Sequence, residues 1–170
     1  MKTGDFAING LPAHTDYPCL FHLLNCTGAV AALCETGVEP AKAVEALGCV
    51  KVNKNRYDEF EVLGRKAVMI LSKNQNPVSF DRSIDTLVQM PGQKTVIVYV
   101  NNINHTNQKD TTWLYDISFE RLKEEGTVLL CTGPRALDLA VRLDLGGFSP
   151  EQYLVVPKRE ALREAVQKTR

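Results

Sequence analysis

From residue 66 to the end of the chain, short apolar runs alternate with segments of helical periodicity. The runs at 66–71, 95–100, 127–131 and 153–156 are rich in Val, Ile and Leu, as buried strands are. After the first run, Phe80, Ile84, Leu87 and Val88 recur at helical spacing. Strands that alternate with helices are typical of crossover connections between parallel strands. The sequence therefore predicts an α/β fold, with a mostly parallel sheet and helices on both faces.

The elements of this sheet carry their own boundary signals. Ser79 is predicted to cap the N-terminus of the first helix of this region. The unbroken apolar run at 95–100 predicts a strand that is covered on both faces. A further helix through Phe119 and Leu122 is expected to end at Gly126.

The part of the chain before this region predicts a hairpin, two helices and a second hairpin. Asn9-Gly10 is a turn dipeptide and indicates a short hairpin. Residues 20–35 predict a helix of small apolar side chains, and Pro40 opens a second helix at the position that proline favours. This α-hairpin has little to pack on within its own span, so we expect an uncovered apolar face and self-association. Residues 59–71 predict a β-hairpin that enters the main sheet.

Charge and composition argue against several classes of partner and chemistry. Lys and Arg number 20 and Asp and Glu number 20, so no overall charge favours nucleic acid or an anionic membrane. No apolar run approaches the roughly 18 residues that span a bilayer, and no secretory signal is visible, so a cytoplasmic protein is expected. Five cysteines without a CxxC pair argue against a disulfide framework and a structural zinc site. Neither GxxxxGKS/T nor GxGxxG occurs, so no phosphate-binding loop is predicted within the chain.

A long polar loop follows the run at 95–100 and ends in the only tryptophan, Trp113. In open α/β sheets, loops at the carboxyl ends of strands bind ligands and partners. Asp110 precedes Trp113 in this loop and Asp116 follows it. The alternative is a solvated connection, in which Trp113 anchors the loop and Asp116 caps the next helix. Cys131, at the end of a predicted strand, is expected to be a core thiol rather than a nucleophile.

Three motifs resemble those of the MurT subunits in the Mur ligase family. NPVSFD at 76–81 resembles the family's NPxG turn, which continues with an aromatic residue and Asn. DTTWLYD at 110–116 resembles its DxSWxWD, and TGPRALD at 132–138 its S/T-GxRAxD. The resemblance covers nearly the whole chain, with departures at 107–110 from the family's DGxD and at 55–58 from its GRxE.

The resemblance implies a domain organisation and partners. Residues 51–170 resemble the Rossmann-like C-terminal domain of a Mur ligase, and residues 1–50 resemble the arm and helices that end its central domain. MurT subunits of this family pair with the glutaminase GatD and amidate the D-glutamate of the peptidoglycan precursor lipid II in an ATP-dependent reaction. ATP and Mg are therefore implied for the full-length enzyme, and neither is expected to bind tightly to this chain alone. The central ligase domain is a further expected partner if it is a separate chain.

The resemblance also implies roles for five residues. Asp110 is the expected catalytic residue, a loop aspartate that orients the catalytic His of the partner glutaminase. Asn76 and Arg135 are expected to face the substrate or nucleotide, although structural roles suit both residues equally. Trp113 and Asp116 are expected at the partner interface. No residue is assigned to a metal.

Two other functions are compatible with the sequence. The chain could be a non-catalytic binding or scaffold module descended from a Mur ligase C-terminal domain, which fits the departures in the loop. It could also be an autonomous small α/β enzyme that uses Cys131 or His105, although no nucleophile and base can be paired.

Overall fold

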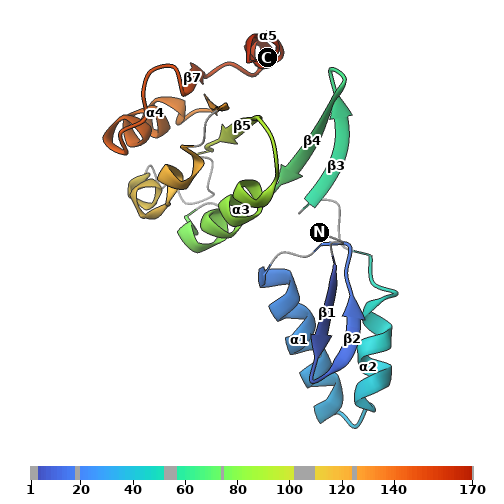
Figure 1. Ribbon diagram of the computed structural model, residues 1–170. Coiled ribbons are helices and arrows are strands. Elements are labelled where there is room, and N and C mark those ends of the chain that lie inside the picture. The colour runs from blue at the N-terminus through green and yellow to red at the C-terminus, as the bar shows by residue number, and fades with distance from the viewer. Residues whose placement is uncertain are drawn as a thin grey trace. The chain divides into compact units, whose positions relative to one another are not determined.

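A computed structural model describes residues 4–17, 20–51, 57–73, 75–101, 110–123 and 126–169 of the chain (Figure 1). The chain divides into two compact units, Met1–Leu71 and Ser72–Arg170, each with its own hydrophobic core. The predicted division into residues 1–50 and 51–170 concerns the family domains that these residues resemble. It stays a prediction, because the two units of the structure are defined by contacts between residues.

Two helices of the first unit form the predicted α-hairpin, α1 (Leu20–Glu35) and α2 (Pro40–Leu47). Glu39 caps α2, since its carboxylate oxygens accept hydrogen bonds from the backbone N–H groups of Ala41 at 3.1 Å and Lys42 at 3.2 Å. Pro40 then occupies the first turn, where its missing N–H costs nothing. The helix boundaries predicted from the sequence are confirmed.

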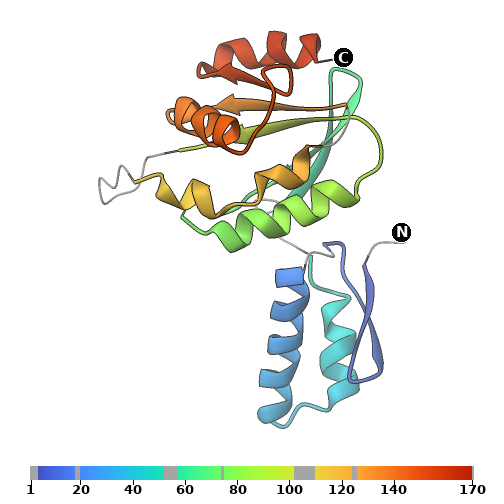
Figure 2. The same cartoon turned by 60° about the vertical axis from the view of Figure 1, so that its left-hand side comes forward.

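A small β-hairpin covers one side of this helix pair (Figure 2). Its strands β1 (Asp5–Ile8) and β2 (Leu11–His14) pair antiparallel through the predicted Asn9-Gly10 turn, in which both residues have positive φ. The helices thus pack on a hairpin outside their own span. The buried side chains of this core are Ile8, Ala13, Val30, Ala43 and Val44.

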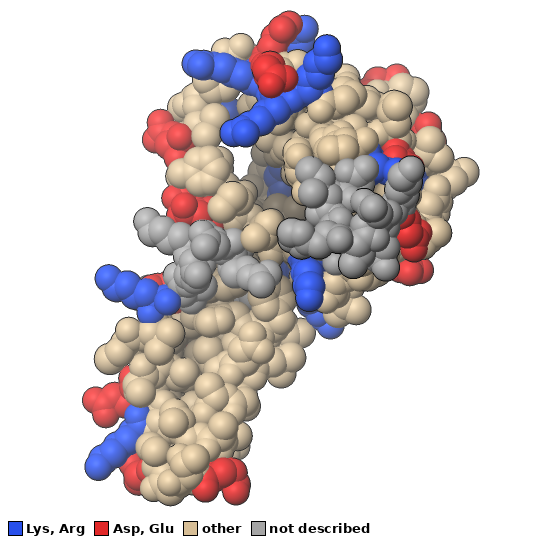
Figure 3. Space-filling view, turned by 180° about the vertical axis from the view of Figure 1, so that it is seen from behind, with Lys and Arg blue, Asp and Glu red and all other residues tan. Residues whose placement is uncertain are grey.

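Helix α1 also has an exposed apolar surface. Leu20 is 46% exposed and Leu24, one turn later, is 62% exposed. Glu35 is the only charged residue of the helix. In the space-filling view, this unit presents a broad uncharged surface, with its charged side chains along one edge and at one end (Figure 3).

A second hairpin ends the first unit, β3 (Tyr57–Val62) and β4 (Arg65–Ile70). Among the described residues its strands pair only with each other, so the prediction that it enters the main sheet is wrong. Period-two alternation identifies the apolar face of a strand, but it carries no information about the neighbouring strand.

The second unit is built on a parallel sheet of three strands in the order β5 (Lys94–Tyr99), β6 (Thr127–Thr132) and β7 (Tyr153–Val156). One face packs against α3 (Pro77–Gln89), α4 (Ala136–Leu145) and the two short helices η1 (Thr112–Asp116) and η2 (Phe119–Leu122). The other face packs against α5 (Leu162–Lys168), which follows the short helix η3 (Arg159–Ala161). The predicted α/β fold, with a parallel Rossmann-like sheet and helices on both faces, is confirmed.

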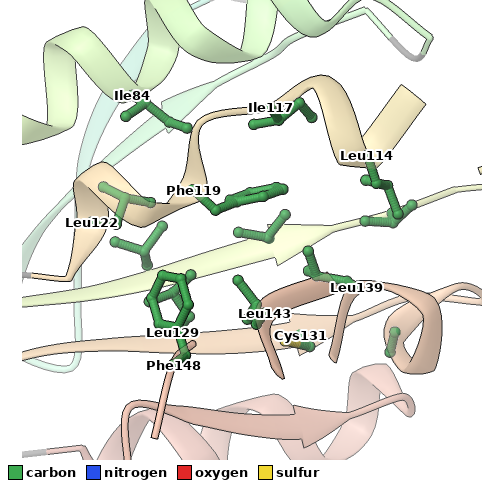
Figure 4. Packing of buried hydrophobic residues seen from close by; sticks show 14 of the residues in the cluster. Ile84, Leu114, Ile117, Phe119, Leu122, Leu129, Cys131, Leu139, Leu143 and Phe148 are labelled. Carbon is green, nitrogen blue, oxygen red and sulfur yellow. The ribbon is translucent and has the colours of Figure 1, made fainter. Parts of the chain in front are cut away.

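The largest core lies between the sheet and the helices α3, α4, η1 and η2 (Figure 4). Phe119, Leu129 and Leu143 are each at most 1% exposed and point toward one another. This packing holds η1 and η2 on the sheet, and these two short helices carry the candidate site.

Three predictions about this unit are corrected. Ile97 is 48% exposed and Tyr99 53%, so β5 is covered on one face only, because α5 packs over β6 and β7 while β5 lies at an edge. Asn76, not Ser79, caps α3, since Asn76 Oδ1 accepts the Ser79 N–H at 3.0 Å and Pro77 takes the first turn. The helix predicted through Phe119 is the 3₁₀ helix η2.

No helix among the described residues is both long and apolar enough to span a membrane.

Candidate functional site

The described part of the polar loop begins at Asp110, an exposed residue after the carboxyl end of β5. Asp110 Oδ1 accepts two hydrogen bonds from Thr112, one from its backbone N–H at 2.8 Å and one from its hydroxyl at 2.7 Å. These bonds hold the pKa of the Asp110 carboxyl below its usual value, the backbone bond contributing most. Asp110 is therefore ionised at neutral pH, and its Oδ2 makes no hydrogen bond to the described residues.

Trp113 lies beneath this aspartate and is 8% exposed. Its indole Nε1 donates a hydrogen bond to the Asp110 carbonyl oxygen at 3.2 Å, and its ring packs on Phe80 of α3 with centroids 5.4 Å apart. The alternative role as an anchor under the loop is thus confirmed for Trp113. A contact between Trp113 and a partner stays a prediction.

The turn between β6 and α4 lies beside the same segment. Gly133 has φ 89°, and a Cβ there would meet the Val100 carbonyl oxygen at 2.6 Å, so only glycine lets this turn approach the end of β5. Arg135 Nη2 pairs with Asp138 Oδ1 at 2.7 Å and donates a hydrogen bond to the Thr111 hydroxyl at 3.3 Å. Arg135 therefore links α4 to the residue that follows Asp110.

Arg142 of α4 is a positioning residue that the sequence did not indicate. Its side chain is 8% exposed, and it donates hydrogen bonds to the carbonyl oxygens of Leu114 at 3.1 Å and Ile117 at 2.7 Å. It also contacts both carboxylate oxygens of Glu120, at 2.7 and 3.1 Å, and so lowers the pKa of Glu120. One buried guanidinium thus holds both η1 and η2. An Arg within an amphipathic helix gives no sign of burial in the sequence.

Asp81 provides a second anchor that sequence reasoning missed. Its two carboxylate oxygens accept hydrogen bonds from the backbone N–H of Ser118 at 2.8 Å and from the Ser118 hydroxyl at 3.2 Å. The only signal in the sequence is its place at the end of NPVSFD, next to Phe80. Asp81 of α3 and Arg142 of α4 both hold the connection between η1 and η2.

The remaining predicted residues lie apart from this cluster or outside the described residues. Asn76 is exposed and caps α3. Asp116 is exposed at the end of η1 and makes no hydrogen bond or ion pair with the described residues. Its predicted role as the cap of the next helix is wrong, because Ser118 holds the cap position of η2 and no side chain caps it. Residues 55–56 and 107–109 and the predicted candidate His105 lie outside the described residues.

Cys131 of β6 has no nucleophilic character. It is fully buried in the main core, and burial raises the pKa of its thiol to about 12. This confirms the prediction of a core thiol and removes Cys131 as the nucleophile of an autonomous enzyme.

The described residues do not fit ATP or its metal ion on their own. Arg135 is engaged with Asp138 and Thr111, and the Oδ1 of Asn76 caps a helix. Within the described ranges, no group of three or more His, Cys, Asp and Glu side chains could hold a metal ion. The site can present a fixed, ionised carboxylate on a rigid base.

Comparisons with known proteins match the same region. A family model described as MurT ligase C-terminal matches residues 71–170. The subunit MurT of lipid II isoglutaminyl synthase (glutamine-hydrolyzing) from Staphylococcus aureus, in strains COL and N315, is 29% identical over 126 residues, which is 74% of this chain and 28% of that protein. The subunit of the same name from Streptococcus pneumoniae (strain ATCC BAA-255 / R6) is 22% identical over 163 residues, 95% of this chain and 36% of that protein.

This chain thus covers between 28% and 36% of the length of these relatives. The family model includes all of the elements that hold Asp110, from α3 to α4, and it spans more than half of the 170 residues. The chain belongs to the MurT ligase C-terminal family.

Proposed function

We propose that this chain acts as the C-terminal part of a MurT-like amidotransferase subunit. Together with a GatD-like glutaminase, such a subunit amidates the D-glutamate of lipid II in an ATP-dependent reaction. Support comes from the family match and from the names of the relatives, which describe a subunit of a glutamine-hydrolyzing synthase.

The observation that carries the proposal is the state of Asp110. This exposed, ionised carboxylate has one oxygen held by Thr112, while the other makes no hydrogen bond to the described residues. A carboxylate in this state can accept the N–H of a histidine on the glutaminase. That bond fixes the imidazole tautomer and stabilises the imidazolium when a cysteine thiolate forms.

The cysteine and histidine of this mechanism belong to the partner. Cys131 is buried and the pKa of its thiol is raised, so it is unsuited to this role. Asp110 is then the contribution of this chain to glutamine hydrolysis. Ammonia released by the glutaminase is used where the ligase activates the D-glutamate carboxyl.

Asn76 and Arg135 remain our proposals for residues that face the substrate carboxylate or the nucleotide. Arg135 follows the carboxyl end of β6, where α/β proteins bind ligands. Asn76 is proposed from the resemblance of NPVSFD at 76–81 to the family's motif. For Arg135, binding a phosphate would require exchange of its 2.7 Å contact with Asp138. Asp116 remains our proposal for a partner contact, because its exposed carboxylate has no described partner.

The test is glutamine hydrolysis by a complex of this chain with a GatD-like glutaminase. Asp110→Asn should keep the complex and lower ammonia release by a factor on the order of 10⁴, because an amide favours the wrong imidazole tautomer. Glu151→Gln, at an exposed position before β7, is the control, and it should leave hydrolysis nearly intact. Wild-type rates for Asp110→Asn in an intact complex would reject the role of Asp110.

A scaffold function is the second candidate, and one feature of α4 favours it. Leu137 is 68% exposed, Val141 51% and Leu145 72%, and their spacing of four residues places them on one face of the helix. An apolar stripe of this kind can bind a partner without any chemistry. Complex formation together with an unchanged rate for Asp110→Asn would favour this function.

A further inference from the structure

We propose that Thr112 is a positioning residue that sets the orientation of the Asp110 carboxylate before the partner binds. The inference rests on the proposed function of Asp110. Both donors of Thr112 meet the same oxygen, Oδ1, at 2.8 and 2.7 Å. Two bonds from one residue to one oxygen fix the rotation of the carboxylate. Oδ2 is left as the oxygen that can accept an imidazole N–H.

The backbone of Asp110 is fixed independently of its side chain. Its carbonyl oxygen accepts the Trp113 indole N–H at 3.2 Å, and Trp113 is itself buried against Phe80. The neighbouring Thr111 hydroxyl accepts a hydrogen bond from Arg135 and donates one to Asp138 at 3.4 Å. The main chain that follows the carboxylate is thus held by α3 and α4, and among the described residues only Thr112 donates hydrogen bonds to the carboxylate.

This arrangement reduces the cost of docking. A carboxylate that is free to rotate must lose that freedom when it meets the histidine, whereas a fixed one has lost it already. Thr112 also stabilises the charged form of Asp110, since a hydroxyl that donates to a carboxylate favours ionisation. Both effects weaken if the hydroxyl is removed and the shape of the side chain is kept, while the backbone N–H bond of Thr112 remains.

The alternative is that Thr112 only begins the helix η1. In that case its hydroxyl contributes to local stability, and the chemistry of Asp110 does not depend on it. The two roles differ in a measurable way, because only a positioning residue alters the pKa of Asp110 and the turnover of the complex together.

The experiment compares Thr112→Val, which removes the hydroxyl, with Thr112→Ser, which keeps it. The pKa of the Asp110 carboxyl is measured in this chain by NMR titration, and ammonia release is measured in the complex with a GatD-like glutaminase. Thr112→Val should raise the pKa of Asp110 and lower kcat about three- to tenfold, the size expected for the loss of one ordinary hydrogen bond while the backbone bond remains. The KM for glutamine should not change, and the affinity of the complex should fall by no more than the same factor. Thr112→Ser should restore both the pKa and kcat.

Two results would overturn the inference, and they differ from a failure of the proposed function. One is an unchanged pKa of Asp110 in Thr112→Val. The other is a wild-type kcat in Thr112→Val under conditions where Asp110→Asn is slow. If Asp110→Asn itself has a wild-type rate, the proposed function is wrong, and the positioning role of Thr112 is then wrong as well.

Discussion

The indole nitrogen of Trp113 lies 3.2 Å from the carbonyl oxygen of Asp110 and donates a hydrogen bond to it. A buried aromatic residue thereby supports the backbone of an exposed aspartate.

Trp113→Phe should therefore loosen the segment without unfolding the protein. The variant loses one hydrogen bond and part of the packing on Phe80, so we expect a loss of about 1–2 kcal/mol in the free energy of unfolding. Trp113→Ala should cost about 3–5 kcal/mol because it leaves a cavity. Urea unfolding followed by circular dichroism measures both. Tyr115→Phe, at a half-exposed neighbour, is the control and should stay within about 0.5 kcal/mol. Equal stability of Trp113→Phe and wild type would contradict the anchoring role.

Arg142→Met should be strongly destabilising. It leaves the Leu114 and Ile117 carbonyl oxygens without their donor and Glu120 without its partner, and we expect a cost of about 2–4 kcal/mol. Arg163→Met, at an exposed position of α5, is a matched control and should change stability by less than about 0.5 kcal/mol. Thermal unfolding of both variants distinguishes a buried guanidinium from a surface one. A small effect at Arg142 would mean that η1 and η2 are held by the core alone.

The same ion pair predicts how stability depends on pH. Arg142 lowers the folded-state pKa of Glu120, so the stabilising contribution is present above the unfolded-state value of roughly 4.3 and is lost as pH falls through the folded-state pKa. Glu120→Gln removes this titration and keeps the shape of the side chain. The difference in Tm between wild type and Glu120→Gln should therefore be largest near neutral pH and should shrink on acidification. A difference that stays constant from pH 7 to pH 3 would show that Glu120 does not titrate with folding.

The exposed face of α1 predicts self-association of this chain. Leu20 and Leu24 form an apolar surface on a helix with a single charged residue. Sedimentation velocity should detect association that depends on concentration, and Leu24→Lys should reduce it. Val78→Lys, at an exposed position of α3, is the control and should leave association unchanged. A strict monomer with slowly exchanging amides in residues 20–35 would contradict the prediction.

Local signals were sufficient for most of the secondary structure. Helix α1 begins and ends at the predicted residues 20 and 35, and α2 begins at the predicted Pro40, because Glu39, Pro40 and the glycine after each helix act within one turn. The strand order could not be obtained in this way. Whether β5 lies at an edge depends on elements far away in the sequence, and the continuous apolar run gives no sign of the exposed Ile97 and Tyr99.

Part of the site was also predictable from local sequence signals. The loop position drew attention to Asp110 and Trp113, and the structure joins these two residues by a hydrogen bond. Arg142 and Glu120 lie 22 residues apart, and neither is unusual in composition, so their pairing appears only in three dimensions. The 3₁₀ form of η2 was missed because apolar spacing over one turn does not distinguish it from an α-helix.

Trp113 is the only tryptophan in the chain, and it lies directly under Asp110. The intrinsic fluorescence of this protein therefore comes from one indole, whose burial and polar contacts set its emission maximum. Any molecule that displaces water from this segment, or shifts its position, changes the emission maximum of Trp113. Binding to this face can thus be followed on the unlabelled protein, with partners that contain no tryptophan of their own.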